Sequence, residues 1–181
     1  MTKNSSWRPA ALSLTVLGVV ARLAPHPPNF STLGASSMFA GARLPGWQAY
    51  LVPMVLMAVT DPILTRTVYH QIGPAQLFVY ASFLLAVWLG RHLRATESIP
   101  RIAALSVINS MQFFLLTNFG TWLFSTTYPQ TLRGLTNCYM LAIPFFGRTL
   151  GSDLLFTGVF FGLHSWLSRT LTRQERVTAS A

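Results

Sequence analysis

Long apolar segments make up most of this chain, and its charged residues stand almost entirely at the ends of those segments. Only 9% of the 181 residues are charged, whereas a soluble domain is usually about 25% charged. Because so few charges cannot cover a soluble surface, the pattern predicts an integral membrane protein. We expect six spans, at residues 9–24, 31–44, 47–64, 74–90, 101–124 and 144–167.

The predicted fold is an all-α membrane bundle of about six transmembrane helices, in one domain over residues 1–181 with short cytoplasmic tails at 1–8 and 168–181. With six spans, alternate connections share a side, and basic residues mark the cytoplasmic side. One side receives Lys3, Arg8, Arg43, Arg91, Arg94, Arg101, Arg169, Arg173 and Arg176, and the other receives Arg22, Arg66, Arg133 and Arg148. This division places both termini in the cytoplasm.

The first apolar segment resembles a signal peptide, because the basic residues Lys3 and Arg8 precede it. Arg22, however, interrupts the region where cleavage would occur, and Pro25 would follow a cut after Ala24. We therefore expect a retained first helix.

The connection Arg22–Phe30 packs three prolines, an arginine and a histidine between two apolar segments. Proline donates no backbone hydrogen bond and pushes its predecessor out of helical geometry, so this stretch is predicted to be a rigid, non-helical loop at one membrane face. His26, between two prolines, is not in a helix. It either bonds a backbone carbonyl or contacts a ligand.

Polar, aromatic and titratable side chains gather on the predicted outer side, whereas the cytoplasmic connections hold little besides arginine. This asymmetry indicates capture of an extracytoplasmic small molecule. Asp61 before Pro62 has an alternative role as a cap or turn, and Asn118 with Trp122 could instead join helices. The candidate binding residues are His26, Asn29, Asp61, Tyr80, Asn118, Trp122, Tyr139, Arg148 and Asp153.

The last span has two distinct faces. Gly147, Gly151, Gly158 and Gly162 fall within roughly a 60° arc of one helix face, which either packs inside the bundle or docks another membrane protein. Asp153 lies on the opposite side. An ionisable group at that depth needs a partner, and Arg22, Arg148 or a bound ligand are the candidates.

The sequence carries no signature of hydrolase, kinase or nucleotide-binding chemistry, and its single cysteine excludes an internal disulfide. We therefore expect a binding protein rather than an enzyme, with no metal or resident cofactor. Cys138 is predicted to be a small buried side chain. The net charge of +9 is dispersed over segment ends, so no nucleic-acid partner is expected. A membrane enzyme using Cys138, His26 or Asp153 is the weakest rival.

Several local motifs carry a resemblance to a known group of proteins. The stretches Arg22–Phe30, Phe78–Phe83, Phe114–Trp122, Cys138–Phe146 and Asp153–Phe156 resemble an uncharacterised family of small bacterial membrane proteins. That family in turn resembles the substrate-binding S components of energy-coupling-factor (ECF) vitamin transporters, and is most similar to the solitary cobalamin type.

The resemblance implies uptake of a small vitamin-like molecule across the bacterial inner membrane, with cobalamin or another corrinoid as the leading ligand. By position, His26, Asp61, Tyr80 and Arg148 would surround it. S components topple in the lipid bilayer, usually docked on an ECF coupling subunit and ATPases. This chain lacks the cysteine that can ligate cobalt before span four. The alternative function is a structural or assembly subunit that joins a larger complex through the glycine face.

Overall fold

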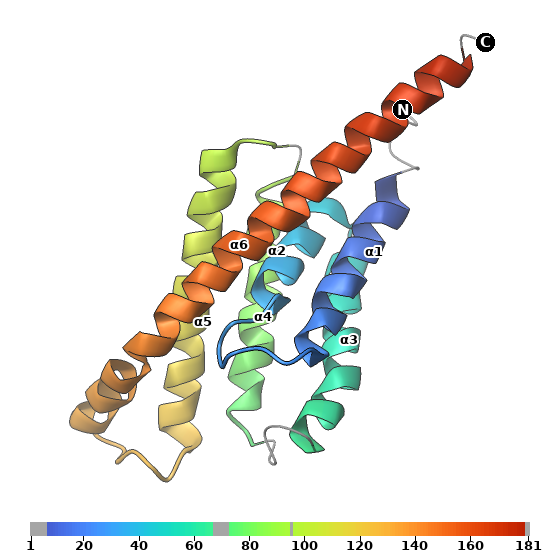
Figure 1. Cartoon of the computed structure of the whole chain (residues 1–181). Coiled ribbons are helices and arrows are strands. Elements are labelled where there is room, and N and C mark those ends of the chain that lie inside the picture. The colour runs from blue at the N-terminus through green and yellow to red at the C-terminus, as the bar shows by residue number, and fades with distance from the viewer. Residues whose placement is uncertain (1–6, 67–72, 95, 180–181) are drawn as a thin grey trace.

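A computed structural model describes residues 7–66, 73–94 and 96–179, with side chains for residues 9–66, 73–94 and 96–170. This part of the chain contains six α-helices and no strand, so the all-α prediction is confirmed (Figure 1). The helices are α1 (Trp7–Val20), α2 (Leu33–Arg43), α3 (Gln48–Leu64), α4 (Gln76–Arg91), α5 (Ile99–Phe124) and α6 (Leu132–Ala179), and a short 3₁₀ turn, η1 (Ala21–Leu23), extends α1.

The main departure from the sequence reading is the length of α6. This helix has 48 residues and contains Pro144 within it, whereas the prediction begins the last span at that proline. Proline removes one backbone hydrogen bond from a helix interior, and the remaining bonds of so long a helix hold it together. Residues 132–143, expected in a connection, therefore lie on α6, and its far end extends beyond the other helices through the predicted tail (Figure 1).

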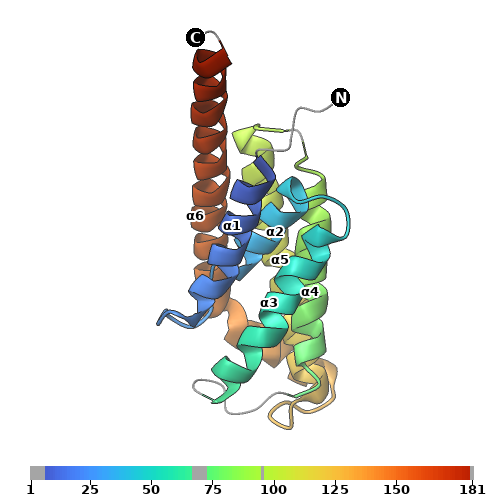
Figure 2. The same cartoon turned by 90° about the vertical axis from the view of Figure 1, so that its right-hand side faces the viewer.

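Helix α2 is the centre of the bundle. It has only 11 residues, and almost all of them are buried against the other five helices (Figure 2). A helix enclosed on all sides needs small side chains so that its neighbours can approach closely. The sequence of α2, Leu-Gly-Ala-Ser-Ser-Met-Phe-Ala-Gly-Ala-Arg, meets that need.

Two glycines bring the backbones of α2 and α4 into direct contact. A Cβ atom at Gly41 would collide with the carbonyl oxygen of Val87, and one at Gly90 would collide with the carbonyl oxygen of Met38. The contact is therefore reciprocal, with a glycine on each helix facing the main chain of the other. Neither position has room for a larger residue without separating the helices.

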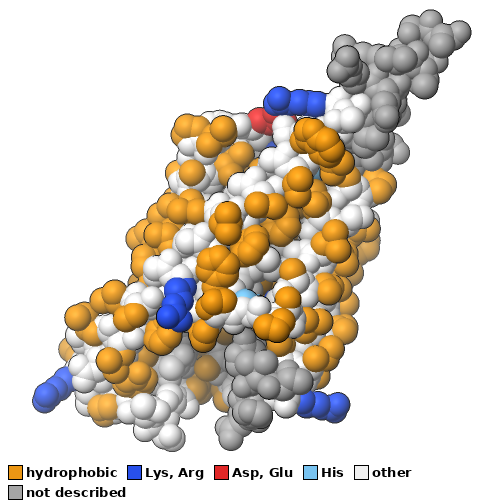
Figure 3. Space-filling view, viewed as in Figure 1, with side chains coloured by type: hydrophobic (Ala, Val, Ile, Leu, Met, Phe, Trp, Pro, Cys, Tyr) orange, Lys and Arg blue, Asp and Glu red, His pale blue; other side chains and the backbone are white. Residues whose placement is uncertain are grey.

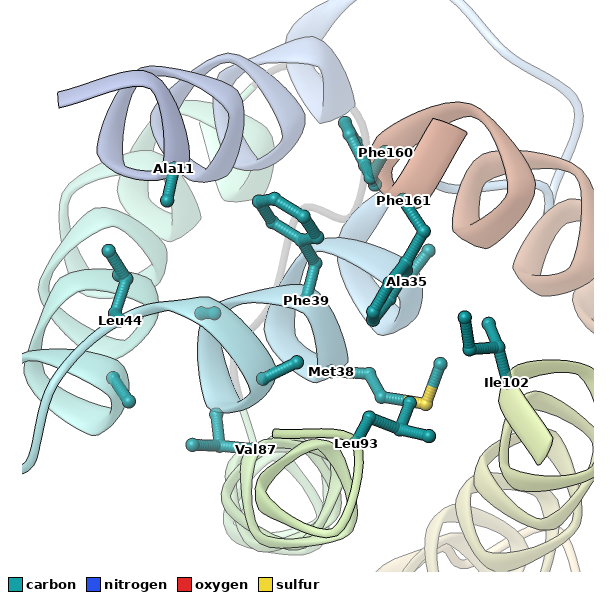
Figure 4. Packing of buried hydrophobic residues seen from close by; sticks show 13 residues of the cluster. Ala11, Ala35, Met38, Phe39, Leu44, Val87, Leu93, Ile102, Phe160 and Phe161 are labelled. Atoms are coloured by element: carbon teal, nitrogen blue, oxygen red, sulfur yellow. The ribbon is translucent and has the colours of Figure 1, made fainter. Parts of the chain in front are cut away.

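The largest apolar cluster surrounds Phe39 of α2. Its ring lies 5.3 Å from that of Phe161 and 5.8 Å from that of Phe160, and both partners come from α6. Met38 and Leu93 fill the space beside them (Figure 4). This cluster fixes α6 diagonally across the bundle.

Arg43 and Arg94 close the end of the bundle that carries the termini. Arg43 donates hydrogen bonds to the carbonyl oxygens of Leu93 and Thr96, each at 3.1 Å. Arg94 donates to the carbonyl oxygen of Leu44 at 3.2 Å. These carbonyls follow the last turns of α4 and α2, where no helical N–H reaches them. Two of the basic residues used to predict orientation thus also hold helix ends.

The surface is apolar over most of the bundle, with few charged side chains on the face shown in Figure 3. Among the described residues, α5 is the one helix long and apolar enough, by length and composition, to cross a membrane. Residues 9–23, α3 and α4 are apolar but shorter.

The glycine contact predicts that Gly90→Ala is destabilising, because the added methyl group meets a backbone carbonyl that cannot rotate away. We expect a loss of at least about 1–3 kcal/mol in the free energy of unfolding, measured by thermal unfolding of the purified protein. Gly158→Ala is the matched control, since open space surrounds Gly158. Equal effects of the two substitutions would contradict the close approach of α2 and α4.

Candidate functional site

The Arg22–Phe30 connection lies at the side of the bundle, partway along its length, instead of across its end (Figure 2). In Figure 1 the loop between α1 and α2 lies above the lower ends of α3 and α5. Because α2 is short, its first residue sits partway along the bundle, and the loop must follow it there. Residues 24–30 are non-helical, as predicted, whereas Arg22 and Leu23 belong to η1. Arg22 is buried, and residues 23–29 are exposed.

Side-chain and backbone contacts hold this loop in place. The ring nitrogens of His26 lie 3.0 Å from the carbonyl oxygen of Pro27 and 3.2 Å from that of Arg22. Asn29 has a positive φ of 61°, which asparagine tolerates better than most residues. The hydroxyl of Thr149 on α6 donates to the Asn29 carbonyl oxygen at 3.3 Å. The loop is therefore tied to itself and to α6.

Arg22 forms a buried ion pair with Asp61 of α3. The Nη2 atom of Arg22 lies 2.8 Å from Asp61 Oδ1, and the two residues are only 8% and 6% exposed. Asp61 Oδ2 also accepts hydrogen bonds from the Tyr80 hydroxyl at 2.6 Å and from Gln76 at 3.0 Å. The Arg22 guanidinium also donates to the Thr60 hydroxyl at 3.2 Å. This cluster joins η1 to α3 and α4.

Asp153 of α6 is buried in a different environment, with only 3% of its surface exposed. Its Oδ2 accepts hydrogen bonds from Ser110 at 2.8 Å and Asn109 at 3.2 Å. The backbone N–H of Ala35, in the first turn of α2, also donates to its carboxylate. All three donors are neutral, and no described Lys, Arg or His forms an ion pair with Asp153.

Neither predicted arginine partner pairs with Asp153. Arg22 is bound to Asp61. Arg148 is exposed, and its guanidinium lies 5.9 Å from the centre of the Phe145 ring. The third candidate partner for the Asp153 carboxylate is a bound ligand, and these contacts do not exclude it.

A cavity of about 120 Å³ lies where the Arg22–Phe30 loop, α2, α4, α5 and α6 meet. Its walls combine polar and apolar groups, as small-molecule sites usually do. The lining residues are Arg22, His26, Asn29, Ser31, Leu33, Gly34, Val79, Phe83, Asn109, Phe113, Thr149, Ser152 and Asp153.

Five of the predicted binding residues lie at or next to this cavity. His26, Asn29 and Asp153 line it directly. Asp61 and Tyr80 lie behind Arg22, which the Asp61 carboxylate holds in place. Asp61 lies within α3 and pairs with Arg22, so the alternative role as a cap or turn is wrong.

The other four predicted residues are not part of the cavity lining. Asn118 donates to the Phe114 carbonyl in its own helix at 2.8 Å. The Trp122 indole N–H donates to the Pro129 carbonyl at 3.1 Å. The remaining two, Tyr139 and Arg148, lie on α6, where the Tyr139 hydroxyl donates to the Leu115 carbonyl at 2.7 Å.

Sequence reasoning missed the polar residues of α5 that contact α6, where Asn109 and Ser110 bond Asp153 and Ser106 bonds Thr157. Ser106, Asn109 and Ser110 are fully buried on one face of that helix. Their spacing of three and four residues was available in the sequence as a polar stripe within an otherwise apolar span. Such a stripe is a signal for a buried polar partner on a neighbouring helix.

The glycine face of α6 does not pack within the described bundle. Gly147, Gly151, Gly158 and Gly162 are all exposed, and a Cβ atom at each would meet no described atom within 4 Å. The interpretation of this face as an internal packing surface is therefore wrong.

Comparison with known proteins gives one match. Residues 3–176 match the model described as "Family of unknown function (DUF6580)". No curated protein and no solved structure matches the chain.

Neutralising the two buried carboxylates is predicted to change the free energy of unfolding by very different amounts. Asp61→Asn leaves the buried Arg22 guanidinium without its counter-ion and should cost about 3–5 kcal/mol of unfolding free energy. Asp153→Asn leaves no cation unpaired, and asparagine still accepts hydrogen bonds and caps α2, so stability should stay within about 1 kcal/mol of wild type. Thermal unfolding of the two variants measures the difference. A large loss in Asp153→Asn would show that this carboxylate is structural.

Proposed function

We propose that this chain, which belongs to the DUF6580 family of unknown function, is a six-helix protein of the bacterial cytoplasmic membrane that binds a small molecule from the outer side for uptake. The observation that carries the proposal is the partly open cavity beside the Arg22–Phe30 loop, with a buried carboxylate that forms no ion pair with a described cation. An apolar exterior around a polar interior site is the expected arrangement for a membrane-embedded binding protein.

The apolar outer surface supports the membrane setting. Large hydrophobic side chains are exposed on α3, α4, α5 and α6, and such a surface would require lipid or another partner to cover it. Helix α2 would be about 16 Å long, about half the hydrocarbon thickness of roughly 30 Å. The Arg22–Phe30 loop would then lie at membrane depth, where irregular backbone is tolerated only beside protein or a water-filled opening. Its exposed residues 23–29 would therefore face such an opening or a partner.

Its resemblance to S components suggests how such a protein would act. Binding would order the outer loops and change how the bundle sits in the bilayer. The sequence has no nucleotide-binding motif, so energy from ATP would have to come through an ECF coupling subunit and its ATPases. We propose binding without turnover, since the Cys138 thiol is buried and points toward the Asn118 carbonyl at 3.5 Å.

The volume of the cavity restricts the size of the vitamin-like solute that we propose. A corrinoid macrocycle is larger than a space of about 120 Å³, so binding of cobalamin would require the Arg22–Phe30 loop to move outward. A compact solute could bind with the loop in its present position. The corrinoid remains a prediction that a binding panel can test.

The glycine face of α6 supports a second candidate, a structural or assembly subunit. Small residues let helices approach closely in lipid, and these four glycines meet only open space. On this proposal the chain joins a larger membrane complex through α6, and the cavity has no ligand of its own.

The proposed topology predicts how new cysteines should react in intact cells. Thr127→Cys should react with a membrane-impermeant maleimide from outside, whereas Ser98→Cys should react only after lysis. Both native side chains are exposed, at opposite ends of α5. Unmodified protein is the blank, since its buried Cys138 should not react. The reverse pattern would overturn the orientation.

The binding proposal predicts that the purified protein binds at least one member of a vitamin panel, including corrinoids, with saturation. His26→Ala should weaken that binding by about tenfold or more, as expected for loss of a polar contact. His92→Ala is the matched control, because His92 lies at the other end of the bundle, where its ring nitrogen bonds the Trp88 carbonyl at 3.1 Å. Isothermal titration gives both affinities.

Failure of the whole panel, together with stable co-purification of a defined partner, would favour the assembly-subunit function. In that case Gly158→Leu should release the partner while the isolated chain remains folded, since the larger side chain points into open space. Retention of the partner by this variant would exclude the glycine face as the contact.

A further inference from the structure

The buried carboxylate of Asp153 lacks the positive charge that its burial demands. Removing a carboxylate from water is costly unless it is paired and fully hydrogen-bonded. Asp153 has hydrogen bonds from Ser110, Asn109 and the Ala35 backbone. The N-terminus of α2 adds only a partial positive charge, so these contacts do not fully neutralise the negative charge of an ionised Asp153.

The other charged group in the cavity cannot provide this compensation. Arg22 lies 2.8 Å from Asp61 and also donates to Thr60, so its charge is already matched. The Arg22 charge at the cavity is therefore neutralised by Asp61, whereas the Asp153 carboxylate has no cationic partner among the described residues. A positively charged solute would form an ion pair with Asp153.

The neighbours of Asp153 favour an organic cation over a metal ion. Hard metal ions take several oxygen ligands, but the Asn109 side-chain oxygen already accepts a hydrogen bond from Gln112 at 3.1 Å. The Ser110 hydroxyl donates its proton to Asp153 itself. No group of three or more His, Cys, Asp or Glu side chains suited to a metal occurs in the part of the chain described.

The remaining wall of the cavity is apolar. Val79 and Phe83 from α4 and Phe113 from α5 line it, and the rings of Phe83 and Phe113 lie 5.3 Å apart. Such a wall suits a hydrocarbon body, and aromatic faces also attract organic cations.

We propose that the solute carries an ammonium group that pairs with Asp153, attached to a small apolar body that packs against Phe83 and Phe113. This inference rests on the proposed small-molecule function and narrows its ligand to compact amines. The proposal also explains why a buried carboxylate is present at Asp153, although its neutralisation is predicted to change the stability of the fold little.

The test uses n-butylammonium chloride as the probe on the full-length protein in lipid nanodiscs. Butan-1-ol and sodium butyrate are the neutral and anionic probes of similar shape, and sodium chloride matches the ionic strength. Thermal unfolding and isothermal titration are recorded as each probe is increased. We expect saturable stabilisation by butylammonium, and at least about tenfold weaker binding in Asp153→Asn.

Glu97→Gln is the control for loss of one negative charge. Glu97 is exposed and pairs with Arg169 at 3.2 Å, far from the cavity lining, so this variant should bind butylammonium like wild type. Because Asp153→Asn is expected to fold normally, its thermal transition without probe confirms that weak binding is not unfolding.

Three outcomes would overturn the assignment. Saturable binding of butan-1-ol or butyrate that Asp153→Asn does not alter would exclude the cation while leaving small-molecule binding intact. A response to sodium chloride that depends on Asp153 would assign the site to an inorganic ion. No saturable effect of butylammonium beyond that of sodium chloride would exclude an ammonium site, and the vitamin panel would then decide separately whether the protein binds any small molecule.

Discussion

The enclosure of α2 is the constraint on which the rest of this structure depends. A helix surrounded by five others has little access to water at its ends, so protein groups must satisfy its terminal N–H and carbonyl groups. Arg94 does so at the C-terminal end, through the Leu44 carbonyl. Asp153 does so at the N-terminal end, through the Ala35 N–H. Because α2 is short, the preceding loop lies partway along the bundle, and the cavity forms where that loop meets the other helices.

Two buried aspartates near this loop illustrate how environment divides chemical roles. Asp61 is matched by an arginine and further fixed by Tyr80, so its charge is fully used in joining elements together. Asp153 is equally buried but surrounded by neutral donors. The sequence alone does not distinguish the roles of these two aspartates. Their hydrogen-bond and ion-pair partners do, since Asp61 joins structural elements and Asp153 lines the cavity.

Much of the architecture could be predicted from the sequence, because apolar segments bounded by charges and prolines mark helices directly. The beginning of α6 could not be, since Pro144 was read as a boundary although it lies within the helix. The site was found only in part. His26 and Asn29 stand out in a proline-rich loop, whereas the partnership of Asn109 with Asp153 depends on how α5 meets α6. Trp122 and Tyr139 were grouped with the site by their side of the bundle. The Trp122 indole instead donates to the Pro129 carbonyl just after α5, and the Tyr139 hydroxyl donates to the Leu115 carbonyl on the neighbouring helix α5.

The two faces of α6 connect the candidate functions physically. Asp153 points inward to the cavity, while Gly151 and Gly158, on the opposite side, are exposed. The same segment of α6 would therefore contact a solute on its inner face and a partner on its outer face. Solute binding and docking need not be alternatives in this fold.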